Sequence, residues 1–547
     1  MIPGLRIDEQ HKALYYEKGY WTTHTLNDIW IERVRNHGDK EYVADDQGSR
    51  LTYREVDDRA ARLASWLAGH GVAVGDVVSF QIPTWAEFSI VYVACLKVGA
   101  VMHPLSWKFN DEDLVYNMNK VGTKAFICPT YFHKCDYEKM ALDIADRIPS
   151  LGSVALIDKV EPSLHGLPTL SSVARASQPL TAKPAVSADD VACILTTSGT
   201  TGKSKEVMLT HNNLVFSERS FVKGFKRGER DVMFMPSPLN HATGFFHGIL
   251  SPMILGGRTV LMQDFNAKGA IALMNAEGAT WSMGATPFIY DILTHIEKEQ
   301  GEPLETLGLF LCGGAPVPSS LVRRAWRQGI LLCEIYGSTE SCPHVYVPPE
   351  HCLEWDGAWS GIPFEGIEVR AVDERRREVE RGGHGEECSR GPHQFVGYYA
   401  DPERTDRILD GEGWFYSGDL CRIDEGGRIR ITGRKKEIII RGGENICATE
   451  IDDYLEGCPG VGKHATIGMP DNRLGERICT FVVPADGVVP TLAGITAYLH
   501  ERHVARRLWP EHIELIDAIP TTATGKVKRF LLTDELKKRM GEAAAGA

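Results

Sequence analysis

The 547-residue chain lacks the patterns of a membrane, secreted or nucleic-acid-binding protein. No run approaches the ~18 apolar residues of a membrane span, and the N-terminus has no basic segment followed by an apolar one. Its thirteen cysteines form no C-x-x-C pair and no cysteine–histidine cluster, which suits a reducing compartment and no structural zinc. The formal charge of −13 makes general affinity for nucleic acid unexpected. We expect a cytoplasmic protein without an integral membrane segment.

What the chain does contain is typical of a large α/β protein. It is 43% hydrophobic and 24% charged, and at about 150 residues per domain its length predicts more than one domain. Thr52 and Glu55 form a capping box ahead of an apolar helical face, Gly69 and Gly71 end that helix, and a strand follows at residues 76–81. Helices that alternate with short apolar strands predict layered α/β structure.

The most informative segment runs from Thr196 to Lys205. Seven consecutive threonine, serine or glycine residues lead into two lysines. Glycines let backbone N–H groups approach oxygens, hydroxyls add donors and lysines supply positive charge, so the segment predicts a loop for the phosphates of a nucleotide triphosphate. A Walker loop fits poorly, because its first glycine would be Thr197 and because residues 207–209 are strand-like where a helix should open. A structureless glycine/serine/threonine linker is the other alternative.

Further segments follow this loop in order, at residues 312–316, 336–340, 416–419, 433–445 and 520–526. Together with the loop they resemble the adenylate-forming superfamily of acyl-CoA synthetases, adenylation domains and luciferases. The resemblance extends from Leu51 to Lys526. It implies a large N-terminal domain of layered α/β subdomains over residues 1–433 and a small mobile α+β C-terminal domain over residues 434–547.

The resemblance also implies a reaction, in which a carboxylate attacks the α-phosphate of ATP and pyrophosphate leaves. Lys526 matches the lysine that bridges the carboxylate and the α-phosphate, and Glu340 matches a ligand of Mg²⁺. Thr197 and His241 complete the implied catalytic set. The implied ATP-binding residues are Thr197, Ser198, Gly199, Thr200, Thr201, Gly202 and Lys205 for the phosphates, and Gly313, Gly314, Ala315 and Tyr336 for adenine. Asp419 is implied for ribose and Arg434 for ribose or phosphate, and Gly337 and Thr339 are further implied ATP-binding residues.

The residues that match the acyl pocket are mostly small or apolar, which favours an uncharged acyl group. They are His241, Thr243, Gly244, Phe245, Met283, Gly284, Ala285, Phe288, Ser338 and Val345. An amino-acid adenylation domain would normally carry an acidic residue just before the His241 segment, whereas the nearest acid is Asp231 in a turn-like stretch.

In this family the C-terminal domain rotates between two half-reactions. Lys436 occupies the position of the hinge, although a solvated turn is an equal alternative there. After rotation, the implied thiol tunnel for CoA is lined by Arg441, Gly442, Gly443 and Glu444.

The sequence most resembles short- to medium-chain fatty acyl-CoA synthetases and cyclohexanecarboxylate-type CoA ligases, which implies a short- to medium-chain fatty or alicyclic acid. It therefore predicts an ATP-dependent acid–CoA ligase that uses a small carboxylic acid, ATP and CoA, with Mg²⁺ as cofactor and a homodimer left open. No carrier-protein signature follows Lys526, which favours free CoA. A carrier protein supplied in trans and a luciferase-like oxidation share the same motifs and stay open.

Two residues beside the phosphate loop depart from the family pattern. Ser204 stands where proline is usual, and Glu206 where glycine is usual. A carboxylate that faced the triphosphate would repel it. Glu206 could instead point outward or pair with Lys203 or Lys205. The competing prediction is a degenerate, non-catalytic adenylate-binding protein in which Glu206 has disabled the loop.

Overall fold

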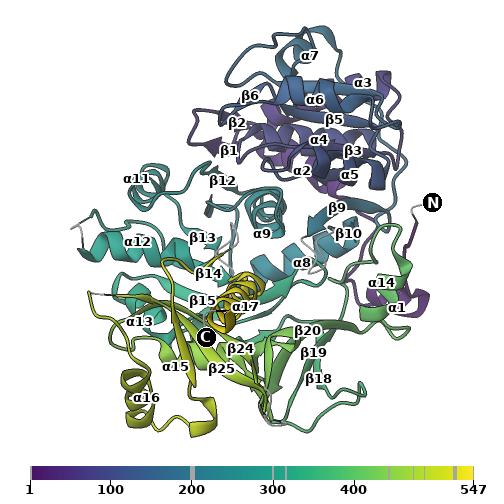
Figure 1. Cartoon of the computed structure of the whole chain (residues 1–547). Coiled ribbons are helices and arrows are strands. Elements are labelled where there is room, and N and C mark those ends of the chain that lie inside the picture. Colours follow the sequence, from purple (N-terminus) through teal and green to yellow (C-terminus); the bar gives the residue numbers. More distant parts are fainter. Residues whose placement is uncertain are drawn as a thin grey trace.

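The computed structural model describes residues 3–197, 204–298, 301–314, 317–441, 444–471, 474–485, 487–521 and 527–545. Its strands form separate sheets, with the C-terminal part of the chain lying against the side of the large domain (Figure 1). The α/β class predicted from the sequence is confirmed. The predicted domain boundary after residue 433 falls at the end of β21 (Ile429–Arg434), next to the short 3-10 helix η3 (Lys435–Glu437).

A nine-stranded sheet forms the middle of the large domain. Its strands, in spatial order, are β17 (Ile362–Pro363), β16 (Cys342–Tyr346), β15 (Leu331–Ser338), β14 (Leu309–Gly313), β13 (Trp281–Gly284), β11 (Val232–Met235), β12 (Arg258–Leu261), β1 (Glu41–Asp45) and β2 (Arg50–Thr52). The central pairs are parallel, whereas β2, β16 and β17 run antiparallel to their neighbours.

A second sheet of the large domain has six strands. Its order is β10 (Lys205–Thr210), β9 (Val191–Thr197), β4 (Val101–Pro104), β3 (Val77–Phe80), β5 (Ala125–Pro129) and β8 (Ser153–Ile157). Every residue of β3, β4 and β5 is buried, as expected for parallel strands covered on both faces. The edge strand β10 is antiparallel to β9, with Lys205 opposite Thr197. The two ends of the predicted phosphate loop are therefore neighbours in one hairpin.

Helices cover these sheets (Figure 1). Around the six-stranded sheet lie α3 (Tyr53–Gly69), α4 (Glu87–Val98), α5 (Asp111–Val121), α6 (Tyr137–Ala145) and α7 (Leu170–Ala176). With the nine-stranded sheet lie α8 (His211–Gly224), α9 (Ala242–Phe245), η1 (Phe246–Leu250), α10 (Ser251–Leu255), α11 (Ala267–Glu277), α12 (Thr286–Lys298) and α13 (Ser319–Arg327). Beyond these are α1 (Glu9–Glu17), α2 (Leu26–His37), η2 (Pro349–His351), α14 (Pro402–Ile408) and the small hairpin β6 (Tyr131–Phe132) and β7 (Cys135–Asp136).

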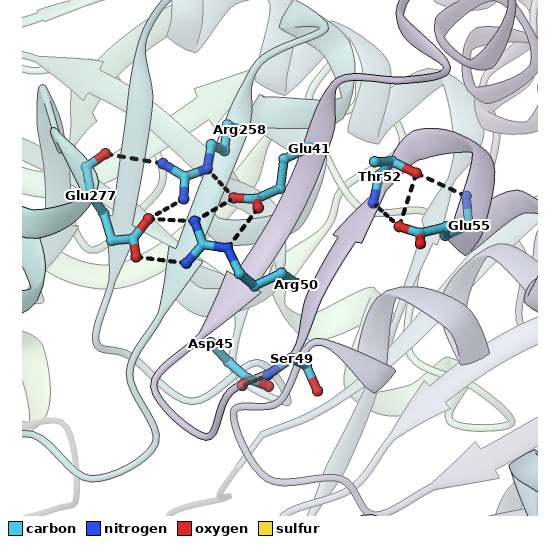
Figure 2. Close-up of polar contacts among 8 residues, drawn as sticks. All are labelled: Glu41, Asp45, Ser49, Arg50, Thr52, Glu55, Arg258 and Glu277. Carbon is cyan, nitrogen blue, oxygen red and sulfur yellow. Dashed lines mark hydrogen bonds and ion pairs between the residues drawn. The ribbon is translucent and has the colours of Figure 1, made fainter.

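Figure 2 shows how the sequence begins α3. The Thr52 hydroxyl accepts from the Glu55 backbone N–H at 3.2 Å, and the Glu55 carboxylate accepts from the Thr52 N–H at 2.8 Å. The predicted capping box is thus confirmed, because two N–H groups at the helix start find side-chain partners. The helix ends at Gly69, and the strand expected at residues 76–81 is β3.

The last part of the chain contains two further sheets. The four-stranded antiparallel sheet comprises β18 (Glu368–Val372), β19 (His384–Arg390), β20 (Phe415–Ile423) and β21. The C-terminal sheet comprises β22 (Ile438–Arg441), β23 (Glu444–Cys447), β24 (Val461–Asp471), β25 (Gly475–Pro484) and β26 (His512–Leu515), with α15 (Ala448–Leu455), α16 (Leu492–Glu501), η4 (Arg506–Leu508) and α17 (Arg529–Ala545). It has hydrophobic clusters of its own, separate from the core of the large domain. No helix in the described ranges is long and apolar enough to cross a membrane.

Candidate nucleotide and acyl site

Three predicted nucleotide residues meet where the nine-stranded and four-stranded sheets adjoin. Tyr336 comes from β15, whereas Asp419 and Arg434 lie opposite each other on β20 and β21. The Tyr336 hydroxyl donates to Asp419 Oδ2 at 2.8 Å, and Arg434 Nε contacts Asp419 Oδ1 at 3.0 Å. Residues 83 and 98 positions from Tyr336 in the sequence therefore converge on one carboxylate.

The hydroxyl of Tyr336 is held in its protonated form. Burial of the ring, and then the nearby charges of Asp419 and Glu387, raise the pKa of Tyr336 well above its ordinary value. The hydroxyl can therefore donate to Asp419 Oδ2 at any physiological pH. Arg434 contacts the other oxygen of the same carboxylate, Oδ1.

A second group of predicted residues meets at the start of β10. Lys205 Nζ lies 3.7 Å from Glu340 Oε1 and donates to the hydroxyl of Tyr398 at 3.1 Å. Tyr398 in turn donates to Glu340 Oε1 at 2.7 Å. Tyr398 is a residue that sequence reasoning missed, because a tyrosine within Val396–Tyr399 carries no signal that separates it from a core aromatic.

Glu340 fits the Mg²⁺ role that the resemblance implies. Its carboxylate is a hard oxygen ligand, and Lys205 beside it places the site where phosphate oxygens would lie. The described ranges contain no group of three or more metal-ligating side chains. This donor set suits a cation that arrives with a nucleotide and keeps phosphate oxygens among its ligands.

Glu206 is buried, and its negative charge is paired. Its carboxylate forms an ion pair with Lys120 of α5, and Ser204 Oγ lies 3.1 Å from Glu206 Oε1. Ser204 Oγ also donates to Asn117 Oδ1 at 2.6 Å, so both departures from the family pattern belong to one network. Side chains alternate along a strand, which places Lys205 on the opposite side, toward Glu340. Lys120 was not among the partners that the sequence suggested.

The predicted acyl residues lie at the ends of β13 and around α9. A Cβ on Gly284 would lie 2.6 Å from Phe288 Cδ2, and one on Gly244 would lie 2.1 Å from the Pro238 carbonyl oxygen. Position 244 therefore requires glycine because the clash is with backbone, whereas a side chain at position 284 would require the Phe288 ring to move. Their neighbours Met283 (buried) and Ala285, Thr243 and Ser338 (half-buried) accompany them, and His241 is exposed just before α9.

Phe245 and Val345 are completely buried. Phe245 packs edge-on against Tyr92 at 5.2 Å between ring centroids, and Val345 belongs to a small cluster with Cys421. Phe288 packs against Phe265 at 4.7 Å. These predicted pocket residues thus contribute to the hydrophobic core around the site.

Some of the remaining adenine and tunnel residues lie within the described ranges. Gly313 ends β14, Gly314 has a positive φ of 88°, and a Cβ on Gly337 would lie 2.1 Å from the Cys342 carbonyl oxygen. Thr339 lies in the turn after β15. Arg441 makes a two-pronged ion pair with Glu511, with both distances 2.8 Å.

Several predicted residues lie outside the described residues, namely Ser198, Gly199, Thr200, Thr201, Gly202, Ala315, Gly442, Gly443 and Lys526. Lys436 belongs to η3 and Glu444 to β23, but their side chains also lie outside the description. Thr197 is described as the last residue of β9.

Known proteins match nearly the whole chain. Residues 30–399 match the AMP-binding enzyme family, and residues 450–526 match the AMP-binding enzyme C-terminal domain. The chain is 41% identical to the medium-chain fatty-acid–CoA ligase of Escherichia coli (strain K12), over 98% of this chain and 94% of that protein. It is 32% identical to a feruloyl-CoA synthase from Amycolatopsis sp, over 90% and 95%. The structure of ATP-bound MatB from Rhodopseudomonas palustris superposes with a TM-score of 0.83 at 28% identity, covering 94% of this chain and 99% of that one.

Proposed function

The chain belongs to the AMP-binding enzyme family, and from this membership we propose that it is an ATP-dependent, AMP-forming acid–CoA ligase, an acyl-CoA synthetase. It would join a carboxylic acid to AMP with release of pyrophosphate and then transfer the acyl group to CoA. The observation that carries this proposal is the convergence of Tyr336, Asp419 and Arg434 beside the Lys205–Glu340 pair. Tyr336 matches an adenine contact, Asp419 with Arg434 matches a ribose contact, and Lys205 with Glu340 matches the phosphates and their cation.

In the proposed site, each described residue has one task toward ATP. Asp419 accepts hydrogen bonds from the ribose hydroxyls, and Arg434 holds the carboxylate in place. The ring of Tyr336 lies against adenine, for which an aromatic face is suited. Lys205 and Thr197 stand at the two ends of the loop that meets the β- and γ-phosphates. Glu340 would hold Mg²⁺, which when bound neutralises phosphate charge as pyrophosphate leaves.

We assign the attack on the α-phosphate to a site completed by Lys526. Its ammonium would bridge the acid and the α-phosphate, since a cation between two anions lowers their mutual repulsion as the bond forms. His241, exposed before α9, would stand near the acyl and phosphate oxygens. After rotation about Lys436, the end of β22 at Arg441 would border the entry path of CoA.

We propose a medium-chain fatty acid as the substrate. The support is the name of the Escherichia coli relative and the small or apolar character of the residues around Gly244 and Gly284. The feruloyl-CoA synthase relative makes an aromatic acid the second candidate. A carrier protein in place of CoA is a further alternative that the same adenylation chemistry allows.

The test is acid-dependent ATP–pyrophosphate exchange, followed by assay of CoA thioester formation. The acids are acetate to dodecanoate, cyclohexanecarboxylate, benzoate and ferulate. We expect exchange to peak with medium-chain acids, and Lys526→Ala to lower it by about 100-fold, the size of effect seen when a transition-state contact is removed. Lys537→Ala, at an exposed lysine of α17, serves as the matched control. If none of the acids supports pyrophosphate exchange, adenylation is refuted. If an acid supports exchange but no CoA thioester forms, a carrier protein is favoured as the acyl acceptor.

A further inference from the structure

A buried carboxylate lies behind the proposed ribose site and has no task in the reaction described so far. Glu387 is on β19, next to β20 in the four-stranded sheet, and its exposed fraction is 0%. Removing a charged carboxylate from water is costly unless other groups compensate for it. The contacts of Glu387 therefore show which groups compensate for the cost of burying its carboxyl group.

Glu387 uses its two oxygens on two different partners. Oε1 lies 3.1 Å from Nε2 of His344, a residue of β16 that is also completely buried. Oε2 lies 3.3 Å from the hydroxyl of Tyr336. The carboxyl group thus connects the histidine on one side with the tyrosine that holds Asp419 on the other.

The number of protons in this network follows from its geometry. His344 Nδ1 lies 3.2 Å from the Cys342 carbonyl oxygen, which can only accept, so Nδ1 must carry a hydrogen. A hydrogen bond between Nε2 and Glu387 Oε1 then needs one more proton, carried either by the imidazole or by the carboxyl group. In both cases the His344–Glu387 pair has no net charge, which explains how a carboxyl group is accommodated without exposure.

The hydroxyl of Tyr336 has a single hydrogen and two nearby acceptors. Asp419 Oδ2 at 2.8 Å is the closer, and Glu387 Oε2 at 3.3 Å is the weaker partner. The tyrosine oxygen is therefore held between two carboxyl groups. Without the Glu387 carboxyl group, the ring of Tyr336 could move into the space that this group fills. The hydrogen bond from Tyr336 to Asp419 would then be lost.

We propose that Glu387 and His344 are positioning residues for nucleotide binding, which act through Tyr336 to fix the Asp419 carboxylate for the ribose hydroxyls. The inference rests on the proposed function, because it assigns the ribose contact to Asp419. Orientation matters here since a two-pronged contact with neighbouring hydroxyls requires both carboxylate oxygens in fixed places. Neither residue touches the nucleotide itself.

The decisive readout is the preference for ribose hydroxyls, measured as the ratio of the dissociation constants for 2′,3′-dideoxy-ATP and ATP. We expect the wild type to bind ATP at least about 10-fold more tightly, the effect of hydrogen bonds to a charged group. Glu387→Leu should bring this ratio close to one. Glu387→Gln should keep it, because the amide has the size of the carboxyl group, can donate to Nε2 of His344 and leaves the Tyr336 hydrogen on Asp419.

Two controls separate the possible failures. Glu138→Leu removes another buried carboxylate, which accepts from Ser163 Oγ and the Leu164 N–H at 2.7 Å each in the distal part of the large domain. It should lower the melting temperature and leave the ratio unchanged. Asp419→Asn should lower the ratio as strongly as Glu387→Leu.

An unchanged ratio in Glu387→Leu would overturn the inference, as would an equal loss in Glu138→Leu. If Asp419→Asn leaves the ratio unchanged while Glu387→Leu lowers it, the route through Asp419 is wrong. A wild type that does not bind ATP would overturn the proposed function, and the inference with it.

Discussion

At the residue scale, the ion pair between Glu206 and Lys120 decides whether the Glu206 carboxylate can repel the phosphates of ATP. Both groups are largely buried, and their charges compensate each other. We expect Lys120→Met to lower the free energy of unfolding by about 3 kcal/mol, because it leaves a buried carboxylate unpaired. The double variant Lys120→Met/Glu206→Leu should regain most of that loss in thermal denaturation.

The same pair gives a test of the degenerate alternative. Glu206→Gln should change the dissociation constant for ATP by less than about twofold, because Lys120 already neutralises the carboxylate. A twofold change corresponds to about 0.4 kcal/mol of binding free energy. A large gain in ATP affinity would mean that the acid repels the phosphates in solution, and the degenerate reading would then return.

Tyr398 is predicted to hold Glu340 in place. Tyr398→Phe removes the hydrogen bond to Glu340 Oε1 and the acceptor of Lys205. We expect the Mg²⁺ concentration that gives half-maximal pyrophosphate exchange to rise about 10-fold, the effect of one hydrogen bond to a charged group. Tyr399→Phe, at the next residue, is the matched control and should behave as the wild type. Equal behaviour of the two variants would refute the role.

Which single residues lie together at the proposed site was partly readable in the sequence, and their roles stay predictions. Tyr336, Asp419, Arg434, Lys205 and Glu340 stood in recognisable motifs. Their supporting partners are invisible there, because each makes its contact across strands that are far apart in the chain and no local pattern records such a contact.

At the element scale, a cluster of ion pairs joins β1, β2, β12 and α11 (Figure 2). Glu277 accepts from Arg50 at 2.8 and 3.0 Å and also pairs with Arg258, while Glu41 contacts both arginines. Hydrogen bonds from Arg50, and the charges of the two arginines, lower the pKa of Glu277 to about 2. The cluster therefore fastens the edge of the nine-stranded sheet to the helix beside it.

This lowered pKa predicts a pH dependence of stability. A carboxyl group whose pKa falls on folding contributes stability above its unfolded pKa of about 4.3, and the contribution is lost as the pH falls toward 2. Glu277→Gln should lower the free energy of unfolding by about 1 kcal/mol at pH 7, because the cluster is partly exposed. The difference in melting temperature should narrow below pH 4.5. Glu374→Gln, in an exposed turn, should show no difference at either pH.

Elements with strong local signals were predicted well. The capping box placed the start of α3, and the apolar run after the glycine loop is β10. The antiparallel pairing of β10 with β9 had no such signal, because strand direction in a sheet depends on the path of the connecting loop and not on residue type.

At the scale of the whole molecule, η3 connects the two sheets that a domain rotation would move apart. Arg430 of β21 contacts Asp453 of α15 at 3.2 Å, and Thr449 Oγ1 donates to the Thr432 carbonyl oxygen at 2.8 Å. These contacts between the two sides of η3 are one half-buried ion pair and one hydrogen bond, which are weak enough to break during a rotation.

Restricting the backbone at η3 should separate the two half-reactions. Proline fixes φ and removes an N–H donor, so Lys436→Pro should hold the C-terminal domain in one orientation. We expect pyrophosphate exchange within about threefold of wild type and thioester formation at least about tenfold slower, since the first step needs no rotation once the domain is in place. Lys436→Ala removes the same side chain without fixing φ and should support both steps. If the alanine variant fails equally, the side chain and not the hinge is responsible.

The sequence predicted the two-domain division, because motifs and a polar break mark residues 433–437. It could not predict how the C-terminal domain sits on the large one. That arrangement depends on a few polar contacts across η3, and such contacts have no periodicity in the sequence.

The distribution of thiols across this fold has a practical consequence. All thirteen cysteines lie within the described ranges; Cys135 is exposed and Cys447 half-buried, whereas the rest are buried. A maleimide dye should attach to Cys135 first because that thiol is exposed. Since partial burial raises the pKa of the Cys135 thiol, the reaction needs mildly alkaline buffer. A second dye at Lys537→Cys on α17 would form a donor–acceptor pair across the two domains. Energy transfer between them would then report each rotation of the C-terminal domain in single molecules, with the natural chain supplying half of the labelling scheme.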